Sequence, residues 1–494
     1  MKNKLLVLIS CIQFVVCKAN VRIPNIIGSH MVLQQNSNIK LWGWSAPAEK
    51  ISIKVSWDTI TYKIIGSRDA TWMTNIKTPK AGGPHTITIQ GENTINLEDV
   101  LIGEVWLCGG QSNMEWSGDQ GLQQSKIEAP NATNNKLRFF YVSKSTSTSR
   151  QDDLDGKWMV CSPEEMIHFS AIGYFFGKNL NERLNAPIGL INSNWGGTPA
   201  ETWTPEYVIN NNQAIKKGAA SLKPTEWWPY KSELAFNAMI YPITNFSIAG
   251  VIWYQGESNT INYYSYEKLF TGMIESWRKE WKINFPFYFV QIAPFKYEYN
   301  YVGALLRESQ TKSSLYNNTG MVVITDLTPD TNNIHPILKK EVSLRLSNLA
   351  LNKTYGIKNI NCESPIYLSH IIEDDKIKIQ FTNTSNGIIV KGKEITCFEI
   401  AGPDKVFYPA QAIIKYDTVI VFNEKIKTPV AVRYAFNNTA IPNLFSKDGL
   451  PTGFSVTDSK NVAGVARVTK GISFVGADGI VVNNQFITGS VGPN

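Results

Sequence analysis

Between residues 20 and about 98, segments of the chain alternate hydrophobic and polar residues with the period of two that half-buried strands show. In residues 50–57 the apolar members share one face: Ile51, Ile53, Val55 and Trp57. Residues 85–89 alternate in the same way, after a Gly-Gly-Pro turn signal at residues 82–84. The pattern predicts a small β-sandwich over residues 20–98.

The rhythm changes at about residue 99, where apolar strand-like runs begin to alternate with segments of helical period. The candidate strands are residues 105–107, 188–192, 250–254, 287–292 and 321–326. The candidate helices, with apolar residues every three or four positions, are residues 172–184, 266–281 and 338–349. This alternation predicts an α/β domain over residues 99–354, with a parallel sheet flanked by helices on both faces. Ligands of such folds bind at the carboxyl ends of the strands.

Beyond about residue 355 the period of two returns, in residues 376–381, 418–422 and 430–436. We expect a second β-sandwich over residues 355–465, while residues 466–494, rich in Gly, Val and Asn, carry no predicted structure. A chain of 494 residues is long enough for about three domains. The predicted fold class is therefore α/β, with accessory β-sandwich domains before and after the parallel sheet.

The first 19 residues have the features of a signal peptide. Lys2 and Lys4 precede an apolar stretch at residues 5–16, and residues 17–19 offer small side chains to a signal peptidase. We expect cleavage and export to the periplasm or the medium. A lipoprotein anchored at Cys11 is the alternative, although it leaves a very short apolar region. No later stretch reaches the roughly 18 uninterrupted apolar residues of a membrane span, so none is expected.

Charge and cysteine content narrow the classes of partner. Without residues 1–19 the chain has 45 basic and 41 acidic residues, a net charge of about +4 with no dense basic run, which argues against a nucleic-acid partner. Cys362 and Cys397 fall in one β-rich region, where an oxidising compartment would allow a disulfide. No cysteine pair has the spacing of zinc ligands, so neither a metal nor another cofactor is expected. The pattern does not indicate an oligomeric state.

One segment carries the first candidate for chemistry. The apolar run at residues 105–107 stops at Gly109 and Gly110 and is followed by Ser112, which we expect at the N-cap of a helix. A nucleophilic serine is presented in this way at the tip of a strand in α/β hydrolases. An ordinary strand-to-helix turn capped by a serine has the same local pattern, and both interpretations are open at this point.

Three further polar segments follow candidate strands, at residues 192–201, 253–259 and 330–336. Acyl transfer needs a nucleophile, a base and preorganised donors for the oxyanion. Of the five histidines, His335 is the one that follows a candidate strand in a polar loop of the α/β region. Four groups would complete such a site: Ser112, His335, the Gly197 amide, and the side chain of Gln255 or Asn259.

The motifs GGQSNMEW, WGGTPAE, WYQGESN and IHP-x-x-K-K, in this order, resemble those of the SGNH hydrolases and, within them, the sialate O-acetylesterase family. Further matching elements lie at residues 24–35 and 432–451, so the resemblance covers about residues 22–456. The resemblance implies an SGNH-hydrolase-like sheet and an exported, metal-free carbohydrate esterase acting on O-acetylated sialic acid. Acetylated xylan or another plant polysaccharide is the alternative substrate.

Carried over by the resemblance, Ser112 is the nucleophile and His335 the general base. The N–H groups of Ser112 and Gly197 form the oxyanion hole together with the side chain of Gln255, or of Asn259 as the alternative. Many relatives have an aspartate three residues before the histidine, where it orients the imidazole. Here that position is Asn332. Asn332 and Asp330 are therefore the candidates for orienting the His335 ring. Without an aspartate at that position, we expect a Ser–His dyad whose imidazole is held by a backbone carbonyl or an amide.

The remaining candidates concern the substrate. Four tryptophans flank the motifs and either line a sugar site or pack beneath it: Trp116, Trp195, Trp203 and Trp253. Glu257 and Asn259 are candidate substrate ligands, although Glu257 is equally suited to anchor its loop. Arg307, at the start of an expected helix, either meets the carboxylate of a sialic acid or pairs with a local acid.

Two other functions fit parts of the same pattern. A glycoside hydrolase would use Glu201 and Glu257 as paired carboxylates, about 5–10 Å apart across a sugar. A non-catalytic carbohydrate-binding protein would use the β-sandwiches and the many aromatic residues.

Overall fold

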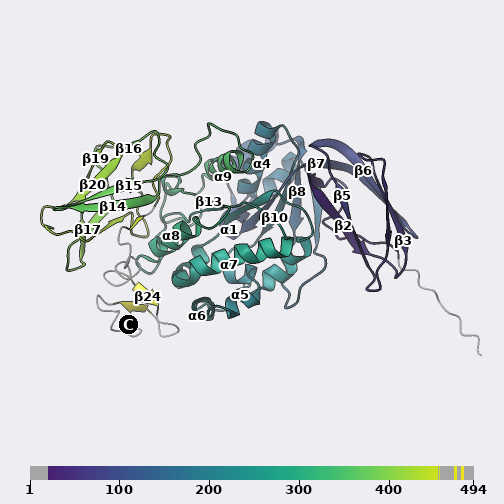
Figure 1. The fold of residues 1–494 in the computed structure, drawn as a ribbon, viewed down its shortest axis with the longest axis horizontal. Coiled ribbons are helices and arrows are strands. Elements are labelled where there is room, and N and C mark those ends of the chain that lie inside the picture. The colour runs from purple at the N-terminus through teal and green to yellow at the C-terminus, as the bar shows by residue number, and fades with distance from the viewer. Residues whose placement is uncertain (1–19, 454, 457–471, 475–479, 483–494) are drawn as a thin grey trace, which may run out of the picture.

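The computed structural model describes residues 20–453, 455–456, 472–474 and 480–482. The predicted signal peptide, Cys11 and most of the predicted tail lie outside these residues. The chain has three regions in a row, with the N-terminal strands and the C-terminal sheets at opposite ends of a central α/β region (Figure 1). This arrangement confirms the predicted fold class.

The central sheet has the strand order β13-β12-β11-β7-β10-β8-β9. Its strands are β7 (Thr94–Gly110), β8 (Asn134–Val142), β9 (Gly156–Cys161), β10 (Ile188–Asn194), β11 (Gly250–Tyr254), β12 (Phe287–Val290) and β13 (Thr319–Val322). Neighbouring strands are parallel, except that β9 runs antiparallel to β8 at the edge. All five candidate strands belong to this sheet, whereas β8 and β9 were not predicted.

Two layers of helices cover the two faces of this sheet. The main helices are α4 (Ala171–Leu184), α7 (Tyr263–Trp281), α8 (Val302–Ser313) and α9 (Lys339–Lys353). Alternate residues of β7 point to opposite faces. Trp106 and Cys108 pack in one cluster with buried residues of α4 and α9, while Val105 and Leu107 pack in a second cluster with those of α7 and α8. The shorter helices are α1 (Ser112–Glu115), α2 (Gln123–Glu128), α3 (Pro163–His168), α5 (Glu206–Asn210) and α6 (Gln213–Ala220).

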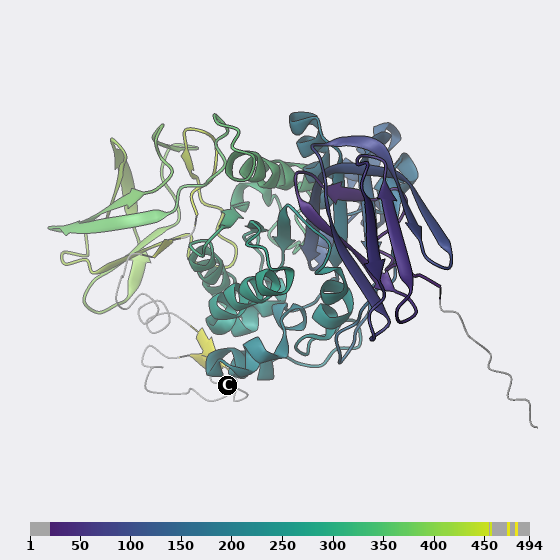
Figure 2. The same ribbon diagram turned by 45° about the vertical axis from the view of Figure 1, so that its right-hand side comes forward.

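The N-terminal region is joined to the central sheet by one continuous strand. Its strands are β1 (Val32–Gln34), β2 (Asn38–Trp44), β3 (Lys50–Val55), β4 (Thr61–Ile65), β5 (Thr71–Lys77) and β6 (Gly82–Gln90). The first part of β7 pairs antiparallel with β6, and its last part pairs with β10 and β11 in the central sheet. The predicted boundary between residues 98 and 99 therefore falls inside a strand, and the turned view in Figure 2 shows how closely the two regions lie together.

The C-terminal region has a core of its own. Its strands are β14 (Tyr367–Glu373), β15 (Lys376–Phe381), β16 (Ile388–Val390), β17 (Phe398–Ala401), β18 (Phe407–Pro409), β19 (Gln411–Lys415), β20 (Thr418–Phe422), β21 (Ala431–Tyr434), β22 (Leu444–Ser446) and β23 (Ser455–Val456). Two antiparallel four-stranded sheets, β14-β15-β20-β19 and β18-β17-β21-β23, enclose apolar side chains such as Ile379 and Val432. Within the predicted tail, β24 (Ile472–Phe474) pairs with β25 (Ile480–Val482).

The disulfide considered between Cys362 and Cys397 is not formed. Cys362 packs in the core of the central sheet, whereas Cys397 packs against the C-terminal core, so their thiols belong to different regions. All four cysteines of the described chain carry free thiols. In the same residues, no helix combines the length and the apolar character that crossing a bilayer requires.

Candidate active site

The end of β7 presents Ser112 at the carboxyl edge of the central sheet. Gly110 has a φ of 137°, and a Cβ there would lie 2.2 Å from the Tyr254 carbonyl oxygen of the neighbouring strand, so only glycine fits. Gln111 is the N-cap of α1. Ser112, which we expected at the N-cap, is instead the first residue of the helix. The short helix turns the chain away from the sheet and leaves the half-buried Ser112 side chain at its edge.

The structure brings Ser112 and His335 together although 223 positions separate them. Nε2 of His335 lies 2.9 Å from Oγ of Ser112. His335 belongs to the loop between β13 and α9, and its ring stacks on that of Trp116, with 4.2 Å between centroids and 21° between planes. The two residues are therefore within hydrogen-bond reach, as a nucleophile and its base must be.

Electrostatics keep the His335 ring neutral at physiological pH. Partial burial and the nearby Lys339 ammonium lower the pKa of His335 from 6.5 to about 4. A neutral imidazole can accept a proton at Nε2, which an imidazolium cannot. The site therefore holds its candidate base in the form that catalysis requires.

Behind this pair lies a buried polar group that we call the inner clamp, formed by Asn113, Glu257 and Lys339. Nζ of Lys339 donates to Oδ1 of Asn113 at 2.6 Å, and Nδ2 of Asn113 donates to Oε1 of Glu257 at 2.6 Å. Burial lowers the pKa of Lys339 to about 7 and raises that of Glu257. Nδ2 of Asn113 also donates to the Ile334 carbonyl at 3.0 Å, which ties α1 to the residue before His335.

The two residues proposed to orient the imidazole do not contact it. Oδ1 of Asp330 accepts hydrogen bonds from the backbone N–H of Asn332 at 2.8 Å and from its Nδ2 at 3.1 Å, so these side chains close their own turn. Oδ1 of Asn333 caps the backbone N–H of His335 at 2.9 Å. Within residues 20–453 no carboxylate is hydrogen-bonded to the His335 ring. The ring contacts are the stack on Trp116 and the hydrogen bond with Ser112, while the inner clamp binds the backbone carbonyl of the residue before His335.

The glycine pair after β10 lies against Ser112. The Gly196 N–H donates to Oε2 of Glu115 at 2.6 Å, and a Cβ on Gly196 would lie 3.3 Å from that of Ser112. Gly197 has a φ of 80°, and a Cβ there would collide with the Trp228 ring at 2.3 Å. Among the described residues the Gly197 N–H has no acceptor, which fits the donor role predicted for it.

The two candidates for the third oxyanion donor belong to a buried group that we call the scaffold cluster, formed by Glu201, Gln255, Asn259 and Asn262. Nδ2 of Asn259 donates to Glu201 at 2.8 Å and to Asn262 at 3.0 Å, so its donors are fully used and the substrate role considered for Asn259 is wrong. Nε2 of Gln255 donates to Asn259 at 2.7 Å and makes a longer contact of 3.4 Å with the Thr198 carbonyl. Gln255 is also completely buried, and its Oε1 accepts a hydrogen bond from the Tyr266 hydroxyl at 3.0 Å, so the role of third oxyanion donor expected for Gln255 is wrong as well.

The carboxylates considered for glycoside hydrolysis are both turned inward. Glu201 is completely buried and accepts hydrogen bonds from the amides of Asn259 and Asn262. Glu257 is 6% exposed and is bound to Asn113, which matches the loop-anchoring role and not a substrate contact. Burial raises the pKa of both carboxyl groups. Both carboxylates are buried and bonded to side-chain amides, so neither is open to a sugar and the paired-carboxylate alternative is wrong.

The substrate role considered for Arg307 is also wrong. Its side chain is 1% exposed and donates to the backbone carbonyls of Asn437 and Asn438 in the C-terminal region. Burial lowers the pKa of Arg307 to about 10. A guanidinium in this position holds the C-terminal region to α8 and is closed to a ligand carboxylate.

The four flanking tryptophans divide into two kinds. Trp203 and Trp253 are completely buried and pack in the core. Trp116 and Trp195 are half-buried, Trp116 on the His335 ring and Trp195 with the Lys144 ammonium 5.9 Å from its ring centroid. Trp116 and Trp195 therefore stay candidates for a sugar contact.

Sequence reasoning missed three residues of the site. Asn113 and Lys339 lie inside the motifs GGQSNMEW and IHP-x-x-K-K, but only their burial and mutual contact give them a role. Trp228, which covers Gly197, lies in a segment without any motif. In the described residues no group of three or more His, Cys, Asp or Glu side chains is arranged to hold a metal ion.

Comparison with known proteins gives a consistent result. The family model described as carbohydrate esterase, sialic acid-specific acetylesterase, matches residues 102–350. A sialate O-acetylesterase of Homo sapiens is 32% identical, over 70% of this chain and 73% of its own, and one of Mus musculus is 29% identical, over 84% and 89%. The crystal structure of a carbohydrate acetylesterase from Xanthomonas citri superposes with a TM-score of 0.81 at 33% identity, covering 89% of this chain and 100% of that chain.

Proposed function

The chain belongs to the sialic acid-specific acetylesterase family of carbohydrate esterases, and we propose that it hydrolyses O-acetyl esters on sugars with Ser112 as nucleophile and His335 as general base. The observation that carries this proposal is the 2.9 Å contact between Oγ of Ser112 and Nε2 of His335 at the carboxyl edge of the sheet. The similarity to sialate O-acetylesterases and to a carbohydrate acetylesterase supports the reaction class.

In the proposed mechanism, Nε2 of His335 takes the proton of Ser112 while Oγ attacks the acetyl carbonyl carbon. The N–H groups of Ser112 and Gly197 stabilise the negative oxygen of the tetrahedral intermediate, and the buried Gln255 side chain supports the loop that carries Gly197 through its contact with the Thr198 carbonyl. The imidazolium then protonates the sugar oxygen as the carbon–oxygen ester bond breaks. A water molecule repeats the sequence on the acetyl-enzyme and releases acetate.

The dyad works without a carboxylate on the imidazole because other contacts fix the ring. Stacking on Trp116 sets its plane, and the bond from Asn113 to the Ile334 carbonyl fixes the backbone beside it. An imidazolium formed during the reaction is less stabilised here than beside an aspartate, since Lys339 adds positive charge nearby. The proposed site therefore gains its rate from positioning and from the oxyanion donors.

The substrate that we propose is O-acetylated sialic acid, and acetylated xylan is the alternative. The support for sialic acid comes from the relatives described as sialate O-acetylesterases. The test is acetate release from 9-O-acetylated N-acetylneuraminic acid and from acetylated xylan, each with Ser112→Ala as control. Faster release from the sialic acid supports the proposal, and release from xylan alone contradicts the substrate. Absence of release from both, and from 4-nitrophenyl acetate, contradicts the esterase function.

We also propose that the protein acts outside the cytoplasm, after removal of residues 1–19. The basic start, the apolar stretch and the small residues that follow support this proposal. Mass spectrometry of the exported protein should show a mature N-terminus at Asn20. A lipid-modified N-terminus at Cys11 would support the lipoprotein alternative, and an intact N-terminus in the cytoplasm would contradict export.

A further inference from the structure

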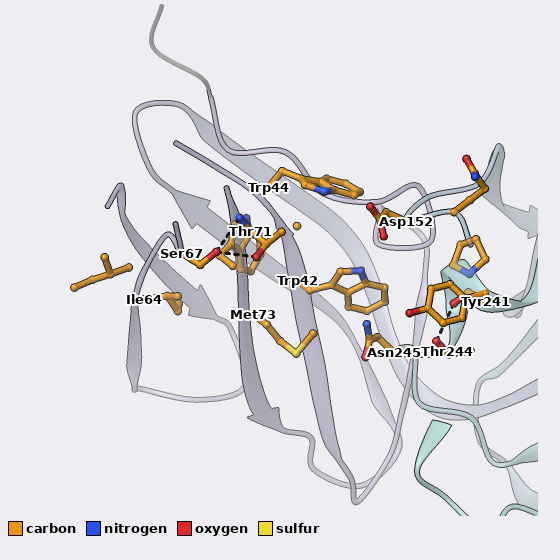
Figure 3. A pocket seen from close by; sticks show the side chains of 15 residues that line it. Trp42, Trp44, Ile64, Ser67, Thr71, Met73, Asp152, Tyr241, Thr244 and Asn245 are labelled. Atoms are coloured by element: carbon orange, nitrogen blue, oxygen red, sulfur yellow. Dashed lines mark hydrogen bonds between the residues drawn. The ribbon is translucent and has the colours of Figure 1, made fainter. Parts of the chain in front are cut away.

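A cavity of about 500 Å³ lies between the N-terminal strands and the central region, and none of its lining residues belongs to the candidate active site (Figure 3). We call it the β2–β5 pocket. One wall comes from the strands β2 and β5 with the end of β4, and the other from residues 151–152, 241–242 and 244–245. The volume falls within the range of about 300–1,000 Å³ that is typical of sites for small ligands.

The strand wall is apolar because of the pairing register of β2 and β5. Trp42 lies opposite Met73 and Trp44 opposite Thr71, so these four side chains share one face of the two-stranded sheet. The other face carries completely buried core residues such as Leu41 and Ile76. An outward face of an antiparallel sheet is normally polar. Here it carries Trp42, which is 7% exposed and packs with the hydrophobic core, beside the more open Trp44 and Met73, which the core cluster does not include.

The opposite wall supplies polar groups. The exposed Asp152 carboxylate makes no hydrogen bond or ion pair within the part of the chain that the structure describes. Oδ1 of Asn245 accepts a hydrogen bond from Nζ of Lys40 at 2.8 Å, which fixes the orientation of this amide. Figure 3 shows the Trp42 ring pointing toward Tyr241 and Asn245, with Asp152 between Trp44 and Tyr241.

This combination of groups has a definite chemical preference. A pyranose ring has an apolar face of C–H groups, which packs on a flat aromatic ring, and a rim of hydroxyl groups that need hydrogen-bond partners. A carboxylate accepts such hydrogen bonds, and an amide both donates and accepts them. The half-buried Trp44 ring, with Trp42 beneath it in the pocket wall, a free carboxylate and an oriented amide therefore match one sugar unit better than a purely apolar or a strongly charged ligand.

We propose that the β2–β5 pocket is a second carbohydrate-binding site, which holds a pyranose unit of the glycan whose acetyl groups the enzyme removes. The identity of that glycan rests on the proposed function. A structural link to the active site supports the proposal: residues 143–155 form one loop, with Lys144 bound to Glu115 near its start and Asp152 in the pocket near its end. Glu115 also accepts a hydrogen bond from the Gly196 N–H beside Ser112. A glycan held in the pocket is thus held by a loop whose other end contacts the active site.

The proposal is tested by calorimetric titration of the Ser112→Ala protein with xylohexaose and with sialyllactose, neither of which it can turn over. The test variants in this background are Trp44→Ala and Asp152→Asn. The control is Trp57→Ala, a tryptophan of the same region that does not line the pocket. Thermal unfolding shows which variants are folded, and Asp152→Asn keeps the test valid if Trp44→Ala is not.

We expect one of the two oligosaccharides to bind. Trp44→Ala should weaken its binding constant at least tenfold, and Asp152→Asn should weaken it by a smaller factor. The control Trp57→Ala should change it by less than twofold. The oligosaccharide that binds identifies the class of glycan. Turnover of 4-nitrophenyl acetate by Trp44→Ala in the otherwise wild-type chain should be unchanged. Equal binding by parent, Trp44→Ala and Asp152→Asn, or no binding of either sugar, would overturn the proposal. Because no turnover is measured in the titration, its result is independent of whether Ser112 is catalytic.

Discussion

Two polar regions at the same edge of the central sheet differ in exposure and in how their hydrogen bonds are used. In the first region, which we call the rim, Ser112 and His335 are half-buried and bonded to each other. In the scaffold cluster, Glu201 and Asn259 are completely buried and bonded to other side chains of the cluster. Both regions follow strands and both contain polar motif residues, yet only the rim keeps groups available to a substrate.

The difference shows what separates a reactive group from a structural one in this fold. A buried polar side chain whose donors and acceptors are all paired stabilises the loops around it, and leaving one unpaired costs about 1–3 kcal/mol. A reactive side chain needs a partner for proton transfer and an open side for the substrate. We therefore expect rim variants to lose activity while staying stable, and scaffold variants to lose stability first.

The largest effect is expected for Ser112→Ala and His335→Ala. Each removes one partner of the proton transfer, so kcat for 4-nitrophenyl acetate should fall by about 10⁴-fold or more. The free energy of unfolding should change by less than about 1 kcal/mol, because both side chains are partly exposed. Initial rates and urea unfolding of the same preparations measure both quantities. A stable Ser112→Ala protein with wild-type activity would refute the mechanism.

Glu201→Ala should have the opposite effect, with a large loss of stability and little loss of activity. The substitution leaves the amides of Asn259 and Asn262 without their acceptor in a fully buried position, at a cost of about 2–5 kcal/mol in unfolding free energy. Activity per folded molecule should stay within a few-fold of wild type. Glu206→Ala, at an exposed position nearby, is the matched control for urea unfolding. Equal stability of the two variants would show that the cluster is not structural.

Asn113→Ala tests whether the inner clamp positions His335. It breaks the bonds to Glu257, Lys339 and the Ile334 carbonyl, and a small displacement of the base should lower kcat by about 10–100-fold while KM changes little. Asn332→Ala is the control, since its side chain does not contact the ring, and it should stay within about threefold of wild type. A larger loss in Asn332→Ala than in Asn113→Ala would restore Asn332 as the orienting residue.

The smallest change is a shift of the pH profile. Because burial and Lys339 lower the pKa of His335 to about 4, the base stays neutral down to that pH, and kcat/KM should reach half its plateau near pH 4. Lys339→Met removes the neighbouring charge and should move this midpoint upward, toward the ordinary histidine value of about 6.5. A wild-type midpoint near 6.5 would contradict the buried, neutral state of the ring.

The same pKa shift gives a stability prediction with a definite sign. Between pH 4 and 6.5 the unfolded chain binds a proton at His335 that the folded chain does not. The contribution of this group to folding is therefore complete above pH 6.5 and decreases as the pH falls through that window. Urea unfolding of wild type and His335→Gln at pH 4.5 and 7.5 measures it, with a smaller loss in the variant.

Local patterns predicted the sheet well but not its edges. The apolar runs at residues 188–192 and 250–254 coincide with β10 and β11 because strands buried on both faces must be continuously apolar. The strand β8 was missed because its first residues, Asn134 to Lys136, are polar and hide the apolar residues that follow. The boundary at residue 98 was misplaced because β7 continues through it in a single strand.

In the candidate site, the motifs predicted those residues that contact a residue of another motif, such as Ser112 and His335. The contact between Ser112 and His335 was expected from strand ends that meet at one edge. The roles of Arg307 and of the inner clamp were not predictable, because they depend on which side of a helix faces the C-terminal region and on contacts across more than a hundred positions. Residue type alone also suggested a substrate role for Asn259, which only its pairing with Glu201 excludes.

The central claim, that His335 activates Ser112, is tested most directly by covalent labelling with a fluorophosphonate followed by peptide mass spectrometry. We predict one adduct per chain, on the peptide that contains Ser112, with its rate strongly reduced in His335→Ala and the adduct absent in Ser112→Ala. A folded wild-type protein that gains no adduct, or that is labelled at another serine, would contradict the claim and favour a protein that only binds carbohydrate.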